Sequence, residues 1–210
     1  MNPVLLSTAY LAPVQYYCKL YAYSEVRIEA CEHYVKQSYR NRCLIAGPQG
    51  PLALTVPVEK SDDLKCPTRD IRISGHGHWR HQHWNALVSA YGLSPFFEYY
   101  ADDFRPFFEK PYAYLLDFNE ALRELVCNLI GLQPVIERTG TYLAKPEDPD
   151  FREVIRPRHP LPDPAFQARP YYQVFAGRLG FIPNLSIVDL LFNMGPESLL
   201  VLRDSILPGK

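Results

Sequence analysis

Short apolar runs open the chain in an order that predicts a sheet with a crossover helix. Residues 4–8 form an apolar run typical of a strand, and residues 25–30 alternate apolar and polar side chains with the two-residue period of a strand. Between them, residues 13–23 carry a helical pattern that Pro13 opens, at a position where its missing backbone donor costs nothing. This order predicts a β-α-β unit, in which one helix joins two parallel strands.

Two further β-rich runs flank a turn. Residues 42–46 and 52–58 are separated by the segment Gly-Pro-Gln-Gly-Pro at 47–51. Glycine supplies positive φ angles and proline interrupts regular pairing, so this segment predicts a hairpin at residues 47–51. Residues 70–74 and 135–137 predict additional strands, and residues 171–175 suit one more.

The middle of the chain, residues 78–131, predicts a block of helices. A first helix covers residues 78–91, and a second begins at Ser94-Pro95, where serine caps the helix and proline takes its first position. The longest pattern covers residues 111–130. Its apolar residues recur at intervals of three and four and stop before Gly131, a residue suited to a helix C-terminus.

A proline-rich segment follows this block. Seven prolines fall between residues 146 and 170, a density that excludes a helix or a central strand. We therefore expect a mostly irregular, exposed strap. A final apolar helix over residues 187–194, capped by Ser186, comes after the strap and is expected to return to the core. These patterns predict an α/β fold with a mixed sheet, in one domain of residues 1–210 that includes the strap.

Composition narrows the class of partner. The apolar fraction of 47% is typical of a globular protein, and a net charge of -1 gives no electrostatic basis for binding nucleic acid. No stretch approaches the ~18 apolar residues that a membrane helix needs, so we expect no membrane insertion. The five cysteines form no Cys-x-x-Cys pair, which favours reduced thiols and a cytoplasmic location.

Two clusters combine aromatic, amide and guanidinium groups. Residues 79–84, Trp-Arg-His-Gln-His-Trp, contain both tryptophans of the chain, and residues 37–42 have a similar character. On a helix, residues four apart share a face, so Trp79 is expected beside His83 and Arg80 beside Trp84. Aromatic faces suit a sugar or a base, and arginines suit its anionic part. We predict one pocket for a small ligand, such as a sugar, a nucleotide-sugar or another phosphate- or carboxylate-bearing compound, with Tyr10 on its rim, formed by Tyr39, Asn41, Arg42, Trp79, Arg80, His83 and Trp84.

Each of these residues also has a structural interpretation. His83 suits a general acid-base whose pKa lies near neutrality, but a histidine on a helix can equally hydrogen-bond a backbone carbonyl. Arg42 and Arg80 suit a phosphate or carboxylate clamp, but they can equally form ion pairs with Asp117 or Asp189. The sequence leaves both alternatives open.

Other chemistry finds less support. His76, His78 and His83 invite a metal interpretation, but no acidic or thiolate ligand has matching spacing, and we predict no metal site. The chain has neither a Walker loop nor a Gly-x-Gly-x-x-Gly motif, so a conventional nucleoside-triphosphate or dinucleotide site is unsupported, and the cofactor stays unknown.

Several motifs together resemble the bacterial WbqC-like family. They are Asn41-Arg42 before the hairpin, Leu-Thr-Val-Pro-Val at 54–58, Trp79-Arg80-x-x-His83-Trp84, Tyr91 with Pro95-Phe96-Phe97, and the closing run at 185–193. They occur in order along essentially the whole chain. Members of this family are associated with gene clusters for surface polysaccharide and O-antigen biosynthesis. The resemblance implies a transferase that acts on an activated sugar or acyl donor; the alternative is a non-catalytic sugar- or nucleotide-binding accessory protein of the same pathway.

One motif departs from the family pattern. Many members carry His-Gln-Pro-x-Tyr-x-Pro after the first strand, whereas this chain has Ser7, Thr8, Ala9, Tyr10 and Pro13 there. If that histidine contacts a phosphate in relatives, this chain makes the contact differently or not at all. The β-α-β opening also favours a ligand at the carboxyl ends of the strands, where Tyr10 and residues 29–32 are expected to emerge.

Overall fold

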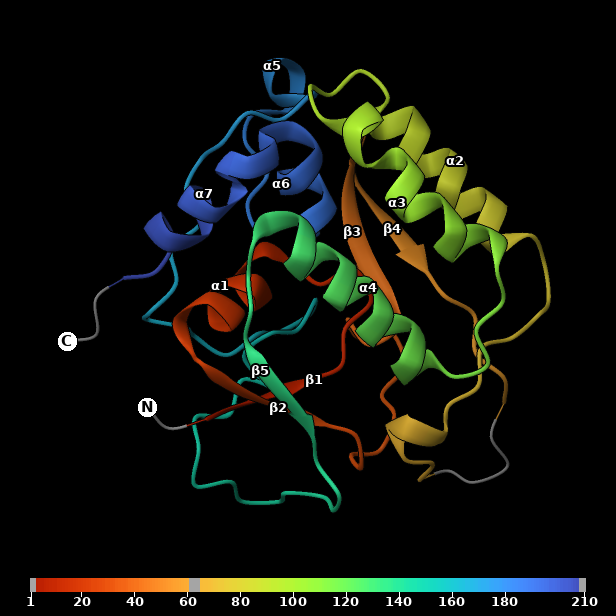
Figure 1. Ribbon diagram of the computed structural model, residues 1–210, viewed down its shortest axis with the longest axis vertical. Helices are drawn as coiled ribbons and strands as arrows, with labels where there is room; N and C mark the ends of the chain where they lie inside the picture. Colours follow the sequence, from red (N-terminus) through yellow and green to blue (C-terminus); the bar gives the residue numbers. More distant parts are fainter. Residues whose placement is uncertain (1–2, 61–64, 208–210) are drawn as a thin grey trace.

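A parallel three-stranded sheet lies at the base of the molecule (Figure 1). The computed structural model describes residues 3–60 and 65–207. The sheet has the order β1 (Val4–Ser7), β2 (Glu25–Glu29), β5 (Val135–Arg138), and both pairings are parallel. Helix α1 (Val14–Ala22) joins β1 to β2, so the predicted β-α-β unit is confirmed.

The predicted hairpin is also present. Strands β3 (Arg42–Gly47) and β4 (Gly50–Thr55) pair antiparallel around a turn in which Gly50 has a φ of 123°, an angle that glycine tolerates. The hairpin forms a sheet of its own, while the parallel pairings form the other sheet. The α/β class is therefore confirmed, with its parallel and antiparallel pairs in two separate sheets.

Three helices make up the central block: α2 (Trp79–Tyr91), α3 (Phe97–Glu109) and α4 (Leu115–Ile130). Gly131 ends α4 in the left-handed conformation, with a φ of 75°, as predicted. The starts of α3 and α4 were placed too early. The Ser94 hydroxyl donates to the Tyr91 carbonyl at the end of α2 and does not cap α3, whose cap residue is Phe96.

The remaining elements are short: α5 (Ala176–Leu179), α6 (Ile187–Met194), α7 (Ser198–Asp204) and the 3-10 turns η1 (Thr68–Asp70) and η2 (Gly195–Glu197). Ser186 caps α6 by accepting a hydrogen bond from the Val188 amide, as predicted. The strand predicted at residues 70–74 is wrong. Arg72 and Ile73 make only isolated bridges, because their partners Tyr114 and Val58 belong to different segments. Residues 171–175 also form no strand.

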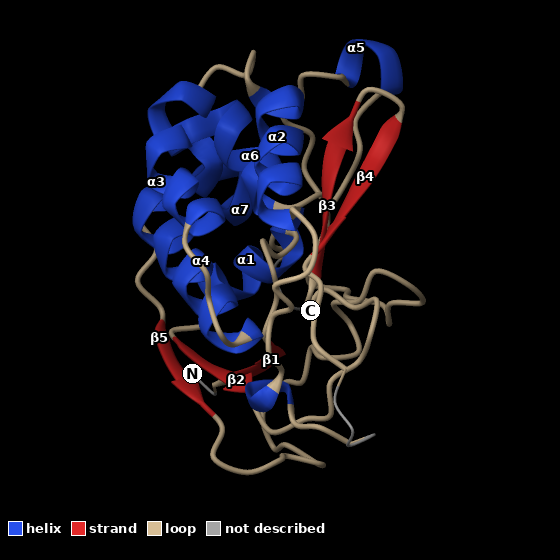
Figure 2. Cartoon of the chain, turned by 90° about the vertical axis from the view of Figure 1, so that its right-hand side faces the viewer, coloured by secondary structure: helices blue, strands red, loops and turns tan. Residues whose placement is uncertain are grey.

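The two faces of the parallel sheet have different neighbours. Figure 2 shows the helices on one side of this sheet and mostly loops on the other. Strand β2 follows this division, since Val26 and Ile28 are buried while Glu25 and Arg27 are exposed. One buried apolar cluster extends from the sheet through α1, α4 and α6.

The free edge of β1 is covered by the proline-rich segment. The Leu5 amide donates to the Pro149 carbonyl (2.9 Å), and the Phe151 amide donates to the Leu5 carbonyl (3.0 Å). Arg27 of β2 pairs with Asp148 at 2.8 Å. Residues 146–170, all of which the structure describes, contain no helix or strand and only two isolated bridges.

Candidate functional site

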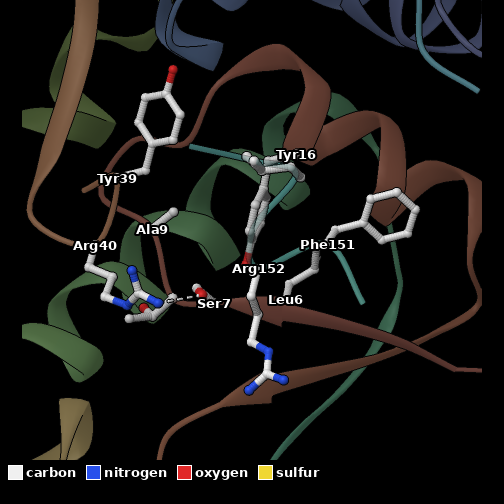
Figure 3. Close-up of a pocket in the computed structure, with 10 residues that line it drawn as sticks. Leu6, Ser7, Ala9, Tyr16, Tyr39, Arg40, Phe151 and Arg152 are labelled. Atoms are coloured by element: carbon white, nitrogen blue, oxygen red, sulfur yellow. Dashed lines mark hydrogen bonds between the residues drawn. The ribbon is translucent and has the colours of Figure 1, made fainter. Parts of the chain in front are cut away.

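A small cavity lies where β1 ends (Figure 3). Its volume is about 10 Å³, close to the ~10–15 Å³ that one water needs. Its walls come from the β1 end, α1, the segment before β3, and the strap. The lining residues are Leu6, Ser7, Thr8, Ala9, Tyr16, Tyr39, Arg40, Phe151, Arg152 and Ile155. The sequence predicted a ligand near this point, at the carboxyl ends of the parallel strands.

Arg40 is fixed on one side of the cavity by a buried carboxylate. Its Nε donates to Glu32 Oε1 (2.8 Å) and its Nη2 lies 2.6 Å from Glu32 Oε2. Both side chains are less than a tenth exposed. The same Nη2 donates to Ser7 Oγ at 2.9 Å, as Figure 3 shows. A buried ion pair of this kind is a rigid support, because neither charge can be separated without desolvation cost.

Two hydroxyl groups of the cavity wall accept a hydrogen bond and keep their own hydrogen for another partner. Ser7 Oγ accepts from Arg40, and Thr8 Oγ1 accepts from Asn119 Nδ2 (3.2 Å), which also donates to the Arg40 carbonyl. Neither hydroxyl donates to another residue in the described part of the chain, so each O–H hydrogen is left to point elsewhere. Arg40 Nη1 likewise makes no hydrogen bond to residues 3–60 or 65–207. The wall therefore offers donors, which match a carboxylate or phosphate oxygen.

Arg152 forms the opposite, strap-side wall. Its Nη2 donates to Asp150 Oδ2 and to the Leu143 carbonyl, both at 2.8 Å, and its Nη1 lies 3.5 Å from Glu29 Oε2. Burial alone raises the pKa of Asp150, but the hydrogen bonds from Arg152 outweigh it and hold that pKa below its ordinary value. Glu29 is fully buried and accepts further hydrogen bonds from Cys31, Thr139 and Leu143.

Two tyrosines provide the aromatic part of the cavity. Tyr16 comes from α1, and in Figure 3 its ring extends toward Leu6 and Arg152. Tyr39 comes from the segment before β3, where its carbonyl accepts from the Tyr10 amide (2.8 Å). Burial raises the pKa of Tyr39 to about 12, so its phenol keeps its proton at neutral pH.

His83 lies outside this lining, in the apolar core. Its Nδ1 is 2.9 Å from the Tyr10 hydroxyl, and it is 5% exposed. Burial lowers the pKa of His83 to about 4, although a hydrogen bond to the Thr55 backbone opposes the shift. The imidazole is thus neutral at pH 7 with one N–H. The contact between Nδ1 and the Tyr10 hydroxyl uses one of the two ring nitrogens.

The tryptophans of the 79–84 cluster belong to the core. Trp79 packs on His83 with ring centroids 5.1 Å apart, as the four-residue spacing predicted. Arg80 does not lie on Trp84: it covers the Trp79 ring at 5.2 Å, and Arg105 covers Trp84 at 5.6 Å. Trp84 itself packs between Phe97 and Phe108.

The second cluster divides between the cavity and the hairpin. Tyr39 lines the cavity, whereas Asn41 is buried and donates from Nδ2 to the Val56 carbonyl (2.9 Å). Arg42 donates from Nε to Thr55 Oγ1 at 3.1 Å. The Thr55 backbone also opposes the downward pKa shift of His83, so Arg42 and the 79–84 cluster both have Thr55 as a neighbour. Of the eight predicted site residues, Tyr39 alone lines the cavity.

The acidic partners considered for Arg42 and Arg80 are used elsewhere. Asp117 pairs with Arg138 at 2.8 Å. Asp189 is fully buried and accepts from the Tyr91 and Tyr171 hydroxyls and from Gln173. Burial raises the pKa of Asp189, against the effect of these three donors.

Sequence reasoning missed five polar residues around the cavity: Ser7, Thr8, Glu32, Arg40 and Arg152. Arg40 stood inside the 37–42 cluster, and Glu32 lay in the range expected beyond β2. The available signal was the strand-end rule, which points to Ser7 at the end of β1. Arg152 gave no such signal, because only the fold brings the strap to this edge.

Two other findings concern metal binding and membrane-spanning helices. In the described ranges 3–60 and 65–207, no three His, Cys, Asp or Glu side chains are placed to hold a metal ion. In the same ranges, no helix has both the length and the apolar character needed to cross a membrane.

Comparison with known proteins found one curated relative and one protein family that resemble this chain. The chain is 26% identical over 192 residues to the uncharacterized protein Rv1507c of Mycobacterium tuberculosis, a match that covers 79% of this chain and 81% of that protein. No solved structure matches significantly. Residues 8–155 match the profile of the WbqC-like protein family. This match covers more than half of the chain and includes most of the cavity, and the chain therefore belongs to the WbqC-like protein family.

Proposed function

We propose that the protein binds the anionic group of an activated sugar or acyl donor at the end of β1 and acts as a transferase in bacterial surface polysaccharide biosynthesis. One observation carries the binding part of this proposal. Ser7, Thr8 and Arg40 line one cavity, carry donor hydrogens that no residue of the described chain accepts, and are held in place by buried groups. Such preorganised donors favour an oxyanion over a neutral ligand. The resemblance to polysaccharide-associated relatives supports the pathway, and five free cysteines suit the cytoplasm.

The second candidate is a sugar- or nucleotide-binding accessory protein without catalysis. This candidate is favoured because the acid-base groups nearest to the cavity are already bonded to other residues. Glu32 is paired with Arg40, Glu29 accepts from several donors, and His83 is neutral in the core with its Nδ1 in contact with the Tyr10 hydroxyl. A general base needs a free position toward the substrate. In the proposal, His83 transfers a proton only if ligand binding releases it from Tyr10.

A thermal-shift screen tests the binding step. The panel contains nucleotide-sugars, free nucleotides, acyl-CoAs and the matching uncharged sugars. Compounds with a phosphate or carboxylate should raise the melting temperature and their uncharged counterparts should not, because only the former fill the donor positions. Stabilisation by uncharged sugars alone would refute the oxyanion proposal.

A turnover assay then separates the two candidates. The stabilising donor is incubated with the protein, and its loss is followed by mass spectrometry. A transferase consumes or slowly hydrolyses the donor, while an accessory protein returns it unchanged. His83→Gln should reduce the rate of donor loss if the histidine carries the proton. An unaltered rate would remove that role and leave the binding site intact.

A further inference from the structure

The cavity in this structure is closed by the strap. Three of its lining residues, Phe151, Arg152 and Ile155, belong to this segment. A volume of about 10 Å³ holds roughly one water, while sites for organic ligands enclose ~300 Å³ or more. A donor molecule therefore cannot occupy the cavity with the strap in place.

The part of the chain that closes the cavity, residues 144–162, lies between two anchors. These are Leu143, just before the strap, and Asp163 within it. At the first point, the Leu143 amide donates to the buried Glu29 carboxylate at 2.9 Å. At the second, Asp163 pairs with Lys19 at 2.7 Å, and both side chains are about 5% exposed or less. Gln15 also donates to Asp163. Residues 144–162 span the distance between these anchors.

Between the anchors, Arg152 is the one residue of 144–162 that is buried. The polar contacts are the two backbone hydrogen bonds to Leu5, the partly exposed pair Arg27–Asp148, and the guanidinium of Arg152 with Glu29 and the Leu143 carbonyl. The apolar contacts come from Phe151 and Ile155, which are partly buried and pack against the core. The ring of Phe151 rests on Lys19 and Tyr23 at the end of α1. No helix or strand stiffens residues 144–162. Segments with few buried apolar contacts are those that open locally while the rest of a protein stays folded.

We propose that residues 144–162 form a lid that opens at the β1 edge to admit the ligand and closes with Arg152 facing it. The anchors at Leu143 and Asp163 stay in place during this motion. Opening breaks both hydrogen bonds to Leu5 and removes the guanidinium from Glu29, which keeps its neutral donors Cys31, Thr139 and Leu143. This inference rests on the proposed ligand site but makes a separate claim about the ligand-free protein.

Hydrogen exchange of single amides tests the lid. Leu5 and Tyr10 form a matched pair, because both are 0% exposed and each donates one backbone hydrogen bond, at 2.9 and 2.8 Å. Only the Leu5 amide is bonded to the strap. In the ligand-free protein, the Leu5 and Phe151 amides should exchange at least ~100-fold faster than the Tyr10 amide. Equal protection of Leu5 and Tyr10 would overturn the lid.

Two variants test whether Arg152 holds the lid closed. Arg152→Gln should accelerate exchange at Leu5 and Phe151 by about tenfold and leave Tyr10 unchanged, since the lost contact acts only on the lid. Arg156→Gln is the control: this arginine lies on the same segment, and within residues 3–60 and 65–207 it pairs only with the exposed Glu153. Equal acceleration by both variants would contradict the role of Arg152. Faster exchange at Tyr10 would indicate that the variant unfolds globally. In that case the comparison of Leu5 with Tyr10 in the wild-type protein decides whether the lid exists.

Inorganic phosphate distinguishes this inference from the proposed function. If both hold, millimolar phosphate should slow exchange at Leu5 and Phe151 in the wild-type protein. Fast exchange without any phosphate effect would support the lid and remove the oxyanion site. Slow exchange at Leu5 in the absence of phosphate would remove the lid while leaving the thermal-shift test of the oxyanion site unaffected.

Discussion

At the residue scale, His83 is buried in the core, whereas its aromatic and cationic neighbours in the sequence suggested a general acid-base in a ligand pocket. The four-residue spacing correctly predicted the contact between Trp79 and His83. The spacing could not show that α2 turns this face to the core, where His83 Nδ1 contacts the Tyr10 hydroxyl and burial lowers the pKa of the imidazole. Helix periodicity fixes which side chains are neighbours, but packing decides whether they face a ligand or the interior.

The pKa of His83 leads to a stability prediction. The unfolded chain binds a proton near the ordinary value of 6.5, whereas the folded protein does so only near 4. The free energy of unfolding should therefore fall as the pH drops from 6.5 to 4, by about 3 kcal/mol from this residue. Urea unfolding across this range should show a shallower pH dependence for His83→Gln, whose side chain does not titrate. Parallel curves for both proteins would contradict a neutral, buried His83.

At the element scale, local patterns predicted most helices and strands correctly and failed where an element depends on distant partners. The β-α-β unit, the hairpin and the caps at Ser186 and Gly131 follow from period, turn residues and capping chemistry. Residues 70–74 have strand-like composition, but the segments beside them supply only single bridges. Pairing partners come from tertiary structure, so β propensity alone could not exclude this strand.

The second anchor of the strap yields a prediction at this scale. Lys19→Met should lower the free energy of unfolding by about 3 kcal/mol or more, because it leaves the buried Asp163 carboxylate without its cation. The double variant Lys19→Met/Asp163→Leu should lose much less than the sum of the two single changes, since apolar side chains then replace both charges. Urea unfolding of the four proteins completes the cycle. Additive losses would show that the two side chains do not form the anchor.

At the scale of the whole molecule, the cavity is a product of topology. Strand β1 carries Ser7 to the edge of the sheet, the segment before β3 brings Arg40, and the strap, more than 140 residues after β1, brings Arg152. From the sequence, a ligand was expected at the carboxyl ends of the parallel strands, which is where this cavity lies. The two aromatic clusters led to a different predicted pocket, near the hairpin and α2. Trp79 and His83 are buried in the core, and of the predicted residues only Tyr39 lines this cavity, so a pocket at the 79–84 cluster stays a prediction.

The most direct measurement compares the affinity of one anionic donor, chosen by the thermal-shift screen, for two variants. Ser7→Ala removes a cavity donor while Arg40 keeps its pair with Glu32, and Arg80→Ala alters the cluster on α2. Loss of a hydrogen bond to a charged group costs about 1.5–3 kcal/mol, or roughly a 10- to 150-fold rise in Kd. Isothermal titration should show this rise for Ser7→Ala, with Arg80→Ala and the control Ser94→Ala close to wild type. A Kd unchanged by Ser7→Ala but raised tenfold or more by Arg80→Ala would place the ligand at the 79–84 cluster and contradict the cavity as the binding site.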